Sequence, residues 1–356
     1  MPDSDKLISA LRMLAPGTML REGLDNVLRA RTGALIVIGD SPQVMAIVDG
    51  GFALDCEFTP TALYELAKMD GAIILNKDAK RILYANAELV PDATIPSAET
   101  GIRHRTAERT AKQTGEIVLA ISQRRSIITL YRGSIRYILR EFPELTSKAH
   151  QAIGTLEKYK QALDRILAEL SVQEFKDTVT VFDVVAAVHR AELVMRGASE
   201  VRRHLVEMGT EGRLLGLQLA ELTRNVEEET ALLIQDYRQA GDSRSLAEVR
   251  QQLGAITLDD MLDPLNVCRI LGHGVSINAL DQAIAPAGYR LLSRIQRLPE
   301  AVIKNLVAAF ADFQGILHAS LEELDEVEGI GEVRARAVKN GLERLEEQVF
   351  NLRHQA

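Results

Sequence analysis

The sequence predicts a multidomain protein in which an α/β domain precedes an all-α region. Apolar segments of strand length alternate with helical stretches as far as residue 143, whereas the apolar residues after Pro143 recur at spacings of three and four. Near the C-terminus, two glycines separate short helical segments. We therefore expect an N-terminal α/β domain with a mixed sheet over residues 1–143, a helical domain over 144–287 and a domain of short helices over 288–356.

The composition limits the partners that this chain can have. The 356 residues are 46% apolar and 26% charged, which is ordinary for two or three globular domains. Aromatic residues make up only 4%, Trp is absent and the formal net charge is -8. These values disfavour base-stacking platforms and diffuse binding of nucleic acid over the whole surface, but they leave room for a local DNA-binding module.

The cysteines and the N-terminus indicate a reducing compartment. Cys56 and Cys268 are far apart in sequence and have no companions at metal-ligand spacing. The first residues are acidic and lack the basic start and apolar core of a signal peptide. No apolar stretch approaches the roughly 20 residues that a membrane-spanning helix needs. We expect a soluble cytoplasmic protein that does not contact a membrane.

The first 143 residues contain a regular series of predicted elements. Leu7, Leu11 and Leu14 recur at helical spacing until Pro16. The run Leu35 to Ile38 is continuously apolar, which predicts a strand buried on both faces. The predicted helices are 20–29, 61–69 and 100–113, and the predicted strands are 34–38, 44–48, 72–75, 81–84, 117–121 and 127–131, with a hairpin turn at 76–80.

Asp70-Gly71-Ala72 opens an apolar run that ends at Leu75. Asp70 would lie at the mouth of a strand, where its carboxylate can bind a metal ion and the glycine allows close approach of a ligand. The alternative is that Asp70 is a cap or a solvated turn residue, which is the commoner role of an acid in a turn. The tripeptide alone does not decide between them.

Arg103-His104-Arg105 forms a second group, shortly after Gly101. Because a helical stretch follows, we expect the group to straddle a helix start, where backbone amides and guanidinium groups can converge on a phosphate. On the helix itself the two arginines would diverge by about 200°. The alternative is therefore a surface helix with solvated arginines.

Taken together, Asp70-Gly71-Ala72 and the segment from Gly101 to Ala107 resemble the paired signatures of the diadenylate cyclase family. Members of that family commonly have Thr before Arg-His-Arg, whereas this chain has Ile102, so a side-chain role at that position is in doubt. The resemblance implies condensation of two ATP molecules into cyclic di-AMP and two pyrophosphates, in sites shared by two domains that meet face to face.

The resemblance also implies a role for each matching residue. A carboxylate with an ordinary pKa of about 3.9 is a poor base for an alcohol, so Asp70 is assigned to Mg²⁺ or Mn²⁺ and to the attacking 3′-hydroxyl. The implied catalytic residues are Asp70, Arg103, His104 and Arg105, and the implied ATP-binding residues are Gly71, Ala72, Leu89, Ile102, Arg103, His104, Arg105, Thr106 and Ser122.

The middle of the chain predicts helices and no catalytic site. Apolar residues from Ile153 to Leu170 form a helical stripe, and a second helical tract is predicted from Glu211 to Ala240. His189, His204 and His273 have no companions at ligand spacing, so we expect them to be structural or exposed. The resemblance adds that this region is an elongated spine that assembles a homo-octamer.

The C-terminal segment resembles a helix-hairpin-helix motif at Gly329-Ile330-Gly331, followed by Arg334 and Arg336. In that motif backbone amides at a helix N-terminus contact a DNA phosphate. The segment from Arg297 to Val307 resembles a degenerate first hairpin. From Tyr289 to Ala356 there are nine Lys and Arg against eleven Asp and Glu, so the alternative of a protein-interaction or assembly module stays open.

These observations predict a diadenylate cyclase that responds to branched or damaged DNA. An alternative of another class is a non-catalytic DNA-junction binder whose N-terminal domain only senses ATP. A third is a purely structural scaffold, which predicts neither ATP turnover nor retention on branched DNA.

Overall fold

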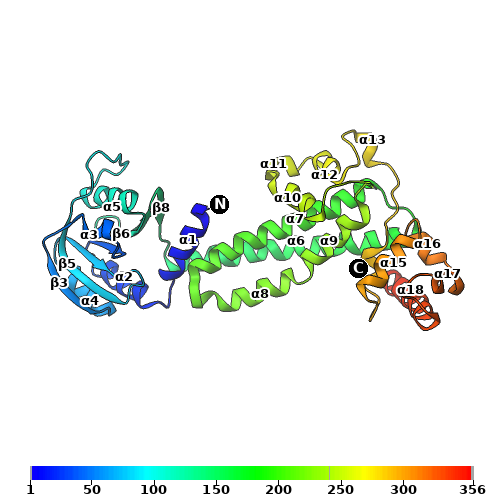
Figure 1. The fold of residues 1–356 in the computed structure, drawn as a ribbon, viewed down its shortest axis with the longest axis horizontal. Helices are drawn as coiled ribbons and strands as arrows, with labels where there is room; N and C mark the ends of the chain where they lie inside the picture. The colour runs from blue at the N-terminus through cyan, green and yellow to red at the C-terminus, as the bar shows by residue number, and fades with distance from the viewer. Residues whose placement is uncertain (1, 240, 354–356) are drawn as a thin grey trace. The chain divides into compact units, whose positions relative to one another are not determined.

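The structure, a computed structural model, describes residues 2–239 and 241–353 (Figure 1). The chain divides into two compact units, Met1–Gln151 with Val201–Leu217 and Ala152–Glu200 with Gln218–Ala356. This division by compactness differs from the three sequence regions expected above, whose boundaries stay a prediction.

The first unit is built on one mixed sheet of eight strands. The strand order is β2-β5-β4-β1-β6-β7-β8, and β3 pairs with β5 off this path. The strands are β1 (Ala34–Ile38), β2 (Val48–Asp49), β3 (Phe52–Glu57), β4 (Ala72–Leu75), β5 (Arg81–Leu89), β6 (Ile117–Ser122), β7 (Ile127–Arg132) and β8 (Ile135–Ile138).

The register of the central strands decides where their ends lie. β1 and β4 are parallel, with Leu35 opposite Ala72. β5 and β6 run antiparallel to them, with Ala87 opposite Ala72 and Ile121 opposite Ala34. The starts of β1 and β4 and the ends of β5 and β6 therefore share one edge of the sheet.

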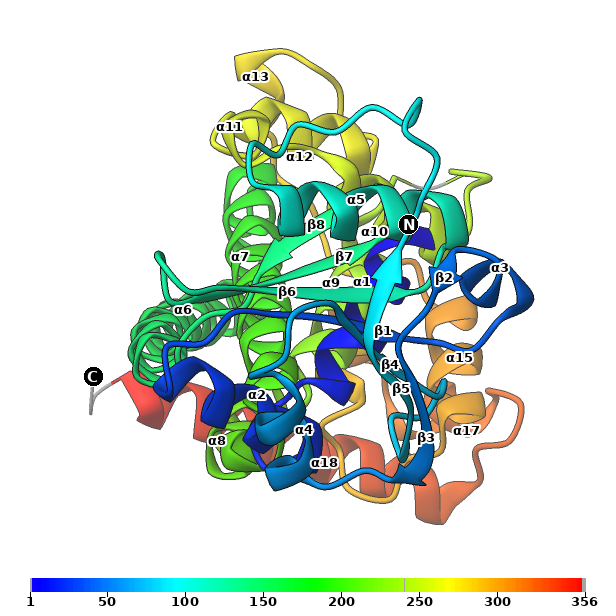
Figure 2. The same cartoon turned by 90° about the vertical axis from the view of Figure 1, so that its left-hand side faces the viewer.

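Helices cover both faces of this sheet (Figure 2). Ile36 and Ile38 of β1 pack with the first helices, whereas Leu35 and Val37 pack against the opposite layer. All five residues of β1 are buried, so the predicted burial on both faces is confirmed. The first layer holds α1 (Pro2–Met13), α2 (Met19–Arg29) and α4 (Pro60–Leu66), and the second holds α3 (Pro42–Met45) and α5 (Ile102–Thr114).

The predicted strand over 44–48 is wrong. Pro42 begins the short helix α3 after Ser41, and the strand β2 starts only at Val48. Val44 is fully buried, so its apolar side chain reflects packing of this helix on the sheet and not strand periodicity. The sequence analysis also missed β3 and β8, the latter following a turn at Gly133.

Gly71 holds the backbone just before β4 in a conformation that a side chain would not tolerate. Its φ is +89°, and a Cβ at this position would lie 2.8 Å from the carbonyl oxygen of Ala87 and 2.8 Å from the carbonyl carbon of Asn86. Asn86 itself has a positive φ of 52°, and the β4–β5 register shifts here. A bulge in β5 thus presses its backbone against Gly71.

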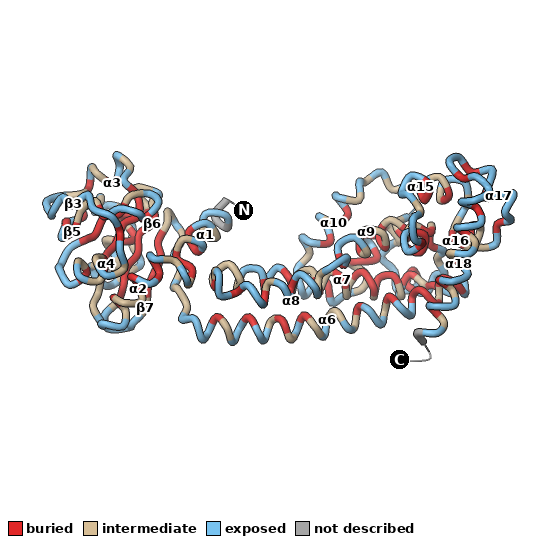
Figure 3. The backbone as a smooth tube through the Cα atoms, turned by 90° about the horizontal axis from the view of Figure 1, so that it is seen from below, coloured by how far each residue is buried: buried red, intermediate tan, exposed pale blue. Residues whose placement is uncertain are grey.

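The rest of the chain is helical, as predicted. Figure 3 shows buried and exposed stretches alternating along α6, in agreement with the predicted apolar stripe. No helix in the described part of the chain is long and apolar enough to cross a membrane. The larger helices are α6 (Phe142–Lys176), α7 (Val181–Met208), α8 (Arg213–Thr223), α9 (Val226–Tyr237), α10 (Leu246–Ala255), α12 (Pro264–Leu271), α15 (Glu300–Ala309) and α18 (Glu332–Arg353), and the shorter ones are the 3₁₀ helix Gly209–Gly212, α11 (Leu258–Met261), α13 (Ile277–Leu280), α14 (Tyr289–Leu292), α16 (Phe313–His318) and α17 (Leu321–Asp325).

The predicted tract from Glu211 to Ala240 is helical, but the structure divides it into α8 and α9. Asn225, with a φ of 62°, interrupts the helical conformation between α8 and α9. The tract ends at Tyr237, and its predicted last residue lies outside the described residues. An asparagine tolerates the left-handed conformation better than most residues, which is why the break needs no glycine.

Two hairpins of the C-terminal segment share one turn conformation. The loop between α17 and α18 contains Gly329 with a φ of +82°, and the loop between α14 and α15 contains Arg297 with a φ of +64°. The upstream hairpin therefore forms a comparable left-handed turn although it lacks the Gly-x-Gly pattern. The two hairpins are therefore more alike in backbone conformation than in sequence.

A fully buried arginine, Arg290, ties α14 to the long helices of the second unit. Its Nη2 donates to Glu174 and, at 3.0 Å, to Ser171, and its Nη1 donates to Glu229 at 3.1 Å. Glu174 is also fully buried. Since an unpaired buried charge is costly, these partners depend on one another.

Asp236 of α9 caps the start of α14, next to the buried Arg290. Its carboxylate accepts the backbone N–H groups of Gly288, Tyr289 and Arg290 at 2.8, 2.6 and 2.9 Å. Burial and the neighbouring Glu174 carboxylate raise the pKa of Asp236 to about 7, while the N–H donors and Arg290 act in the opposite direction.

We predict that Gly71→Ala destabilises the first unit by about 2–4 kcal/mol, because positive φ and the collision with β5 act together. Gly115→Ala is the matched control, since Gly115 has a φ of +73° but nothing lies within 4 Å of its added Cβ. It should cost only about 1 kcal/mol. Denaturant unfolding measures both, and equal costs would show that the contact with β5 is unimportant.

We predict that Arg290→Met lowers the free energy of unfolding by about 3–5 kcal/mol, because it leaves Glu174 charged and buried. The exposed Arg344→Met on α18 should change it by less than about 0.5 kcal/mol. Adding Glu174→Leu to Arg290→Met should recover part of the loss. Thermal and denaturant unfolding test this, and a cost under about 1 kcal/mol for Arg290→Met would contradict the assignment.

Candidate functional site

A cavity of about 810 Å³ opens at the sheet edge where β1 and β4 begin. Its size is within the range of small-molecule sites. Strand ends, the turn before β4 and the start of α5 contribute its walls. The lining residues are Leu35, Gly71, Ala72, Asn86, Ala87, Glu88, Leu89, Gly101, Ile102, Arg103, His104, Thr106, Ser122, Gln123 and Arg124.

The start of α5 supplies hydrogen-bond donors to this cavity. Gly101 is the N-cap residue, and no side chain caps the first N–H groups of the helix. Uncapped N–H groups and the positive end of the helix dipole favour an anion at this point. The first turn has no acidic residue that would compete.

Arg103 lies over a glycine at the start of β1. A Cβ built on Gly33 would overlap the Arg103 guanidinium, so the absence of a side chain at residue 33 makes room for it. Arg103 is half-buried and lines the cavity. Gly33 thus sets the position of a cation at the site, a role that the sequence analysis missed.

His104 stands edge-on to Tyr131, with ring centroids 6.4 Å apart. The Tyr131 hydroxyl donates to Glu99 at 2.8 Å, and Arg136 Nε donates to the same carboxylate at 2.6 Å. Burial is the main cause that lowers the pKa of His104, and the charge of Arg103 adds to it, while Glu99 opposes them. These effects together favour the neutral form of the His104 ring, which can donate one hydrogen bond.

Glu99 is the carboxylate that accepts the hydrogen bond from Tyr131. Burial acts to raise its pKa, but the hydrogen bonds from Arg136 and Tyr131 outweigh it and lower the pKa. Its carboxylate therefore stays ionised and holds Tyr131 in place. No local sequence pattern indicates this contact, because Glu99 and Tyr131 are 32 positions apart.

Two of the predicted catalytic residues do not line the cavity. Arg105 is exposed and donates to the carbonyl oxygens of Glu99 and Thr100 at 3.4 and 3.3 Å, on the side of α5 away from Arg103. Asp70 is exposed in the turn next to Gly71. The predicted residues that the cavity does bring together are Gly71, Ala72, Leu89, Ile102, Arg103, His104, Thr106 and Ser122.

Ile102 lines the rim and is 83% exposed, which is unusual for isoleucine. Asn86, Glu88, Gln123 and Arg124 also line the cavity and were not singled out from the sequence. Asn86 points here because the bulge turns its backbone to positive φ. An asparagine within β5, a residue type that tolerates positive φ, is a local signal for it.

The residues of the C-terminal hairpin are mostly engaged with the protein itself. Arg334 Nη1 donates to the carbonyl oxygen of Gly329 at 2.6 Å, and Arg336 pairs with Glu332 at 2.5 Å. Ile330 is buried, and a Cβ on Gly331 would meet nothing within 4 Å. Backbone amides can be approached at Gly331, but Glu332 places a carboxylate at the same helix start.

Over residues 2–239 and 241–353, no three His, Cys, Asp or Glu side chains are grouped so that they could hold a metal ion. A carboxylate beside the cavity suits Mg²⁺, which is commonly held by one or two carboxylates together with substrate phosphates. Asp70 next to Gly71 has that position, so the residues present fit an ion that is shared with a nucleotide.

The mixed sheet covered by helices on both faces defines an α/β domain, and the polar cavity at its edge, with Arg103 and the uncapped start of α5, is suited to an anionic ligand. Residues 21–135 match the family described as DisA bacterial checkpoint controller nucleotide-binding, and residues 139–280 match the DisA bacterial checkpoint controller linker region. The chain belongs to the DisA family.

Several full-length relatives agree with this. The DNA integrity scanning protein DisA of Symbiobacterium thermophilum is 57% identical over 348 residues, covering 98% of each chain. That of Acetivibrio thermocellus is 55% identical over 346 residues, covering 97% of this chain and 96% of its own. Among solved structures, a double mutant of DacA from Staphylococcus aureus is 21% identical with a TM-score of 0.29, covering 40% of this chain and 91% of its own, a score too low to bear on fold or function.

We predict that Gly33→Ala weakens nucleotide binding roughly 5- to 50-fold by displacing the Arg103 guanidinium, about the cost of one charge-assisted hydrogen bond. Arg103→Ala should have a similar or larger effect. The double variant should bind no more weakly than Arg103→Ala alone, because both changes act through one contact. Calorimetric titration measures this, and additive losses would contradict the coupling.

Proposed function

We propose that this chain is a diadenylate cyclase that condenses two ATP molecules into cyclic di-AMP and two pyrophosphates, under control of branched or distorted DNA. One observation carries the proposal: the two segments whose sequences resemble the cyclase signatures meet at a single cavity, at the start of β4 and the start of α5. Membership of a family whose relatives are named for DNA integrity scanning supports the link to DNA.

The reaction requires two nucleotides facing each other. The 3′-oxygen of each ATP attacks the α-phosphorus of the other, one P–O bond forms and one breaks in each half, and each pyrophosphate leaves with its electron pair. Each 3′-hydroxyl loses its proton to solvent or to a basic group. Because each domain has one such cavity, two domains must meet, so a monomer is inactive and the working form is a homo-oligomer, which the family resemblance puts at an octamer.

The residues of the cavity divide these tasks. The uncapped N–H groups of α5, Arg103 and Thr106 hold phosphate oxygens and stabilise the charge that develops on them. His104, whose ring stands edge-on to Tyr131, donates a hydrogen bond. Leu89 and the backbone near it contact the adenine edge, while Gly71 and Ala72 line the ribose. Arg105 is the weakest of these assignments, because it acts only if it leaves the carbonyl groups of residues 99 and 100.

Asp70 would hold Mg²⁺ or Mn²⁺ and would orient the attacking hydroxyl. A bound divalent ion supplies a lower pKa for that hydroxyl and neutralises phosphate charge. The exposed position of Asp70 suits this, since a second domain carrying a second ATP approaches from solvent.

The DNA contact belongs to the hairpin Gly329-Ile330-Gly331 with Arg334 and Arg336. Contacts through backbone amides carry no sequence information, so the preference is for branched or distorted DNA and not for a base sequence. Several hairpins in one oligomer compensate for a weak single contact. DNA at these hairpins suppresses synthesis, a coupling between two distinct sites.

We predict that the wild type converts ATP with Mn²⁺ to cyclic di-AMP and that Asp70→Asn lowers the rate by at least about 100-fold, as expected when the metal and the nucleophile lose their carboxylate. Asp78→Asn is the control, because Asp78 lies in the turn at the opposite end of β4. Chromatography of the products measures both.

A folded, oligomeric wild type that forms no cyclic di-AMP would overturn the enzyme proposal and would favour the ATP-sensing DNA binder. Equal rates in wild type and Asp70→Asn would overturn the role of Asp70 alone.

We predict opposite effects of two neighbouring changes on binding to four-way DNA junctions. Arg334→Ala should weaken binding about 2- to 5-fold, whereas Glu332→Gln should strengthen it by a similar factor, because it removes a carboxylate from the helix start. Arg344→Ala, farther along α18, serves as the charge-matched control. Fluorescence anisotropy at two salt concentrations measures this, and a weaker junction affinity in Glu332→Gln would contradict phosphate binding at this helix start.

A further inference from the structure

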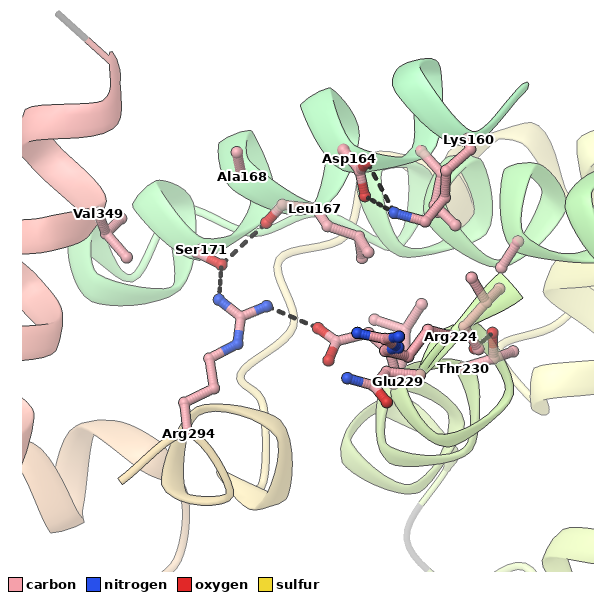
Figure 4. Close-up of a pocket in the computed structure, with 15 residues that line it drawn as sticks. Lys160, Asp164, Leu167, Ala168, Ser171, Arg224, Glu229, Thr230, Arg294 and Val349 are labelled. Carbon is pink, nitrogen blue, oxygen red and sulfur yellow. Dashed lines mark hydrogen bonds and ion pairs between the residues drawn. The ribbon is translucent and has the colours of Figure 1, made fainter. Parts of the chain in front are cut away.

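The second unit contains a cavity of about 350 Å³ that the proposed reaction and the DNA hairpin do not use. It lies between α6, α7 and α9, with Arg294 and Val349 completing it, and Figure 4 shows the polar side chains around it. Its volume is that of a small-molecule site.

The floor of the cavity is apolar. Leu163, Leu167, Val226 and Leu233 are each less than 10% exposed, and Val349 of α18 closes one side. A hydrated ion would find no hydrogen-bond partners on this floor. An apolar or aromatic group bound there would shield the apolar side chains of the floor from water. The floor therefore selects the uncharged part of a ligand.

Two of the three cations at the rim are already matched by carboxylates at the rim. Lys160 Nζ pairs with Asp164 at 2.6 Å, and Arg294 Nη2 pairs with Glu229 at 2.6 Å (Figure 4). Arg294 also donates to Ser171 at 3.4 Å. Within each pair the two charges neutralise each other, so neither cation is free to bind a charged ligand.

Arg224 differs from both. Its carboxylate partner, Glu221, lies outside the cavity, and both side chains of that pair are about two-thirds exposed. Such a pair contributes at most about 1 kcal/mol, so Arg224 can exchange it for a ligand anion. The next residue, Asn225, lines the cavity and begins α9. The first turn of that helix carries Glu227, Glu228 and Glu229, so the helix start itself does not attract an anion. Arg224 is therefore the group that favours a negative charge at this end of the cavity.

We propose that this cavity binds a small organic anion that carries one acidic group on an apolar or aromatic body. The body lies on the floor formed by Leu163, Leu167 and Leu233, and the acidic group contacts Arg224. The occupant also touches Ser171, Glu229 and Arg294, of which the first two hold Arg290, so occupancy stabilises the attachment of α14 to α6 and α9.

The probe for this site is 8-anilinonaphthalene-1-sulfonate, an aromatic sulfonate whose fluorescence rises on leaving water. N-phenyl-1-naphthylamine, the same body without the sulfonate, reports on the floor alone. Both are titrated into the full-length wild type and three variants. Ala168→Trp places an indole over the cavity from an exposed position on α6, Arg224→Gln removes the cation, and Gln251→Trp is an exposed control on α10 outside the cavity.

We expect Ala168→Trp to weaken binding of both probes at least tenfold and Gln251→Trp to leave both unchanged. Arg224→Gln should weaken the sulfonate three- to tenfold and leave the neutral amine unchanged. Equal sulfonate affinity in wild type, Ala168→Trp and Arg224→Gln would overturn the proposal. So would a change in the mass of the assembly in Ala168→Trp by light scattering, which would make this face a contact between copies of the chain.

Discussion

The parallel pairing of β1 with β4 is the constraint on which the nucleotide site depends. It places the starts of two central strands at one edge of the sheet, and the antiparallel neighbours β5 and β6 bring their ends to the same edge. Gly33 and Gly71 precede the two starts, so the backbone there leaves space for an arginine and for the bulge of β5. The N-terminus of α5 lines the cavity at this edge of the sheet.

Both proposed phosphate contacts of this chain rely on helix starts and not on a strongly basic surface. At α5 the first turn has no acid, and Arg103 adds a cation. At α18 the first residue is Glu332, which pairs with Arg336. For a chain with a net charge of -8, this difference predicts that the start of α5 attracts an anion more strongly than the start of α18.

The sequence predicted the parts of the fold that follow from local pattern. The buried run of β1, the hairpin between β4 and β5 and the helix that begins beside Arg103 are confirmed. The strand at 44–48 was wrong, because the packing of Val44 and the helix start at Pro42 override the apolar run. The local pattern of apolar residues does not show where tertiary packing favours a helix over a strand.

The contacts that position the site were beyond the sequence because they join distant residues. Gly33 is 70 positions from Arg103, Glu99 is 32 from Tyr131, and Asn86 reaches the cavity only through a bulge. Arg290 was equally hidden, since nothing local distinguishes a fully buried arginine from a solvated one. Such residues become visible only when the strands and helices are placed in space.

The most direct test of this account is hydrogen exchange of the full-length protein with and without ATP, in the absence of a divalent metal so that turnover is blocked. The account predicts slower exchange in four separate segments, 71–72, 86–89, 101–106 and 122–124, because they line one cavity. Slower exchange confined to other parts of the chain, while ATP is bound, would contradict it.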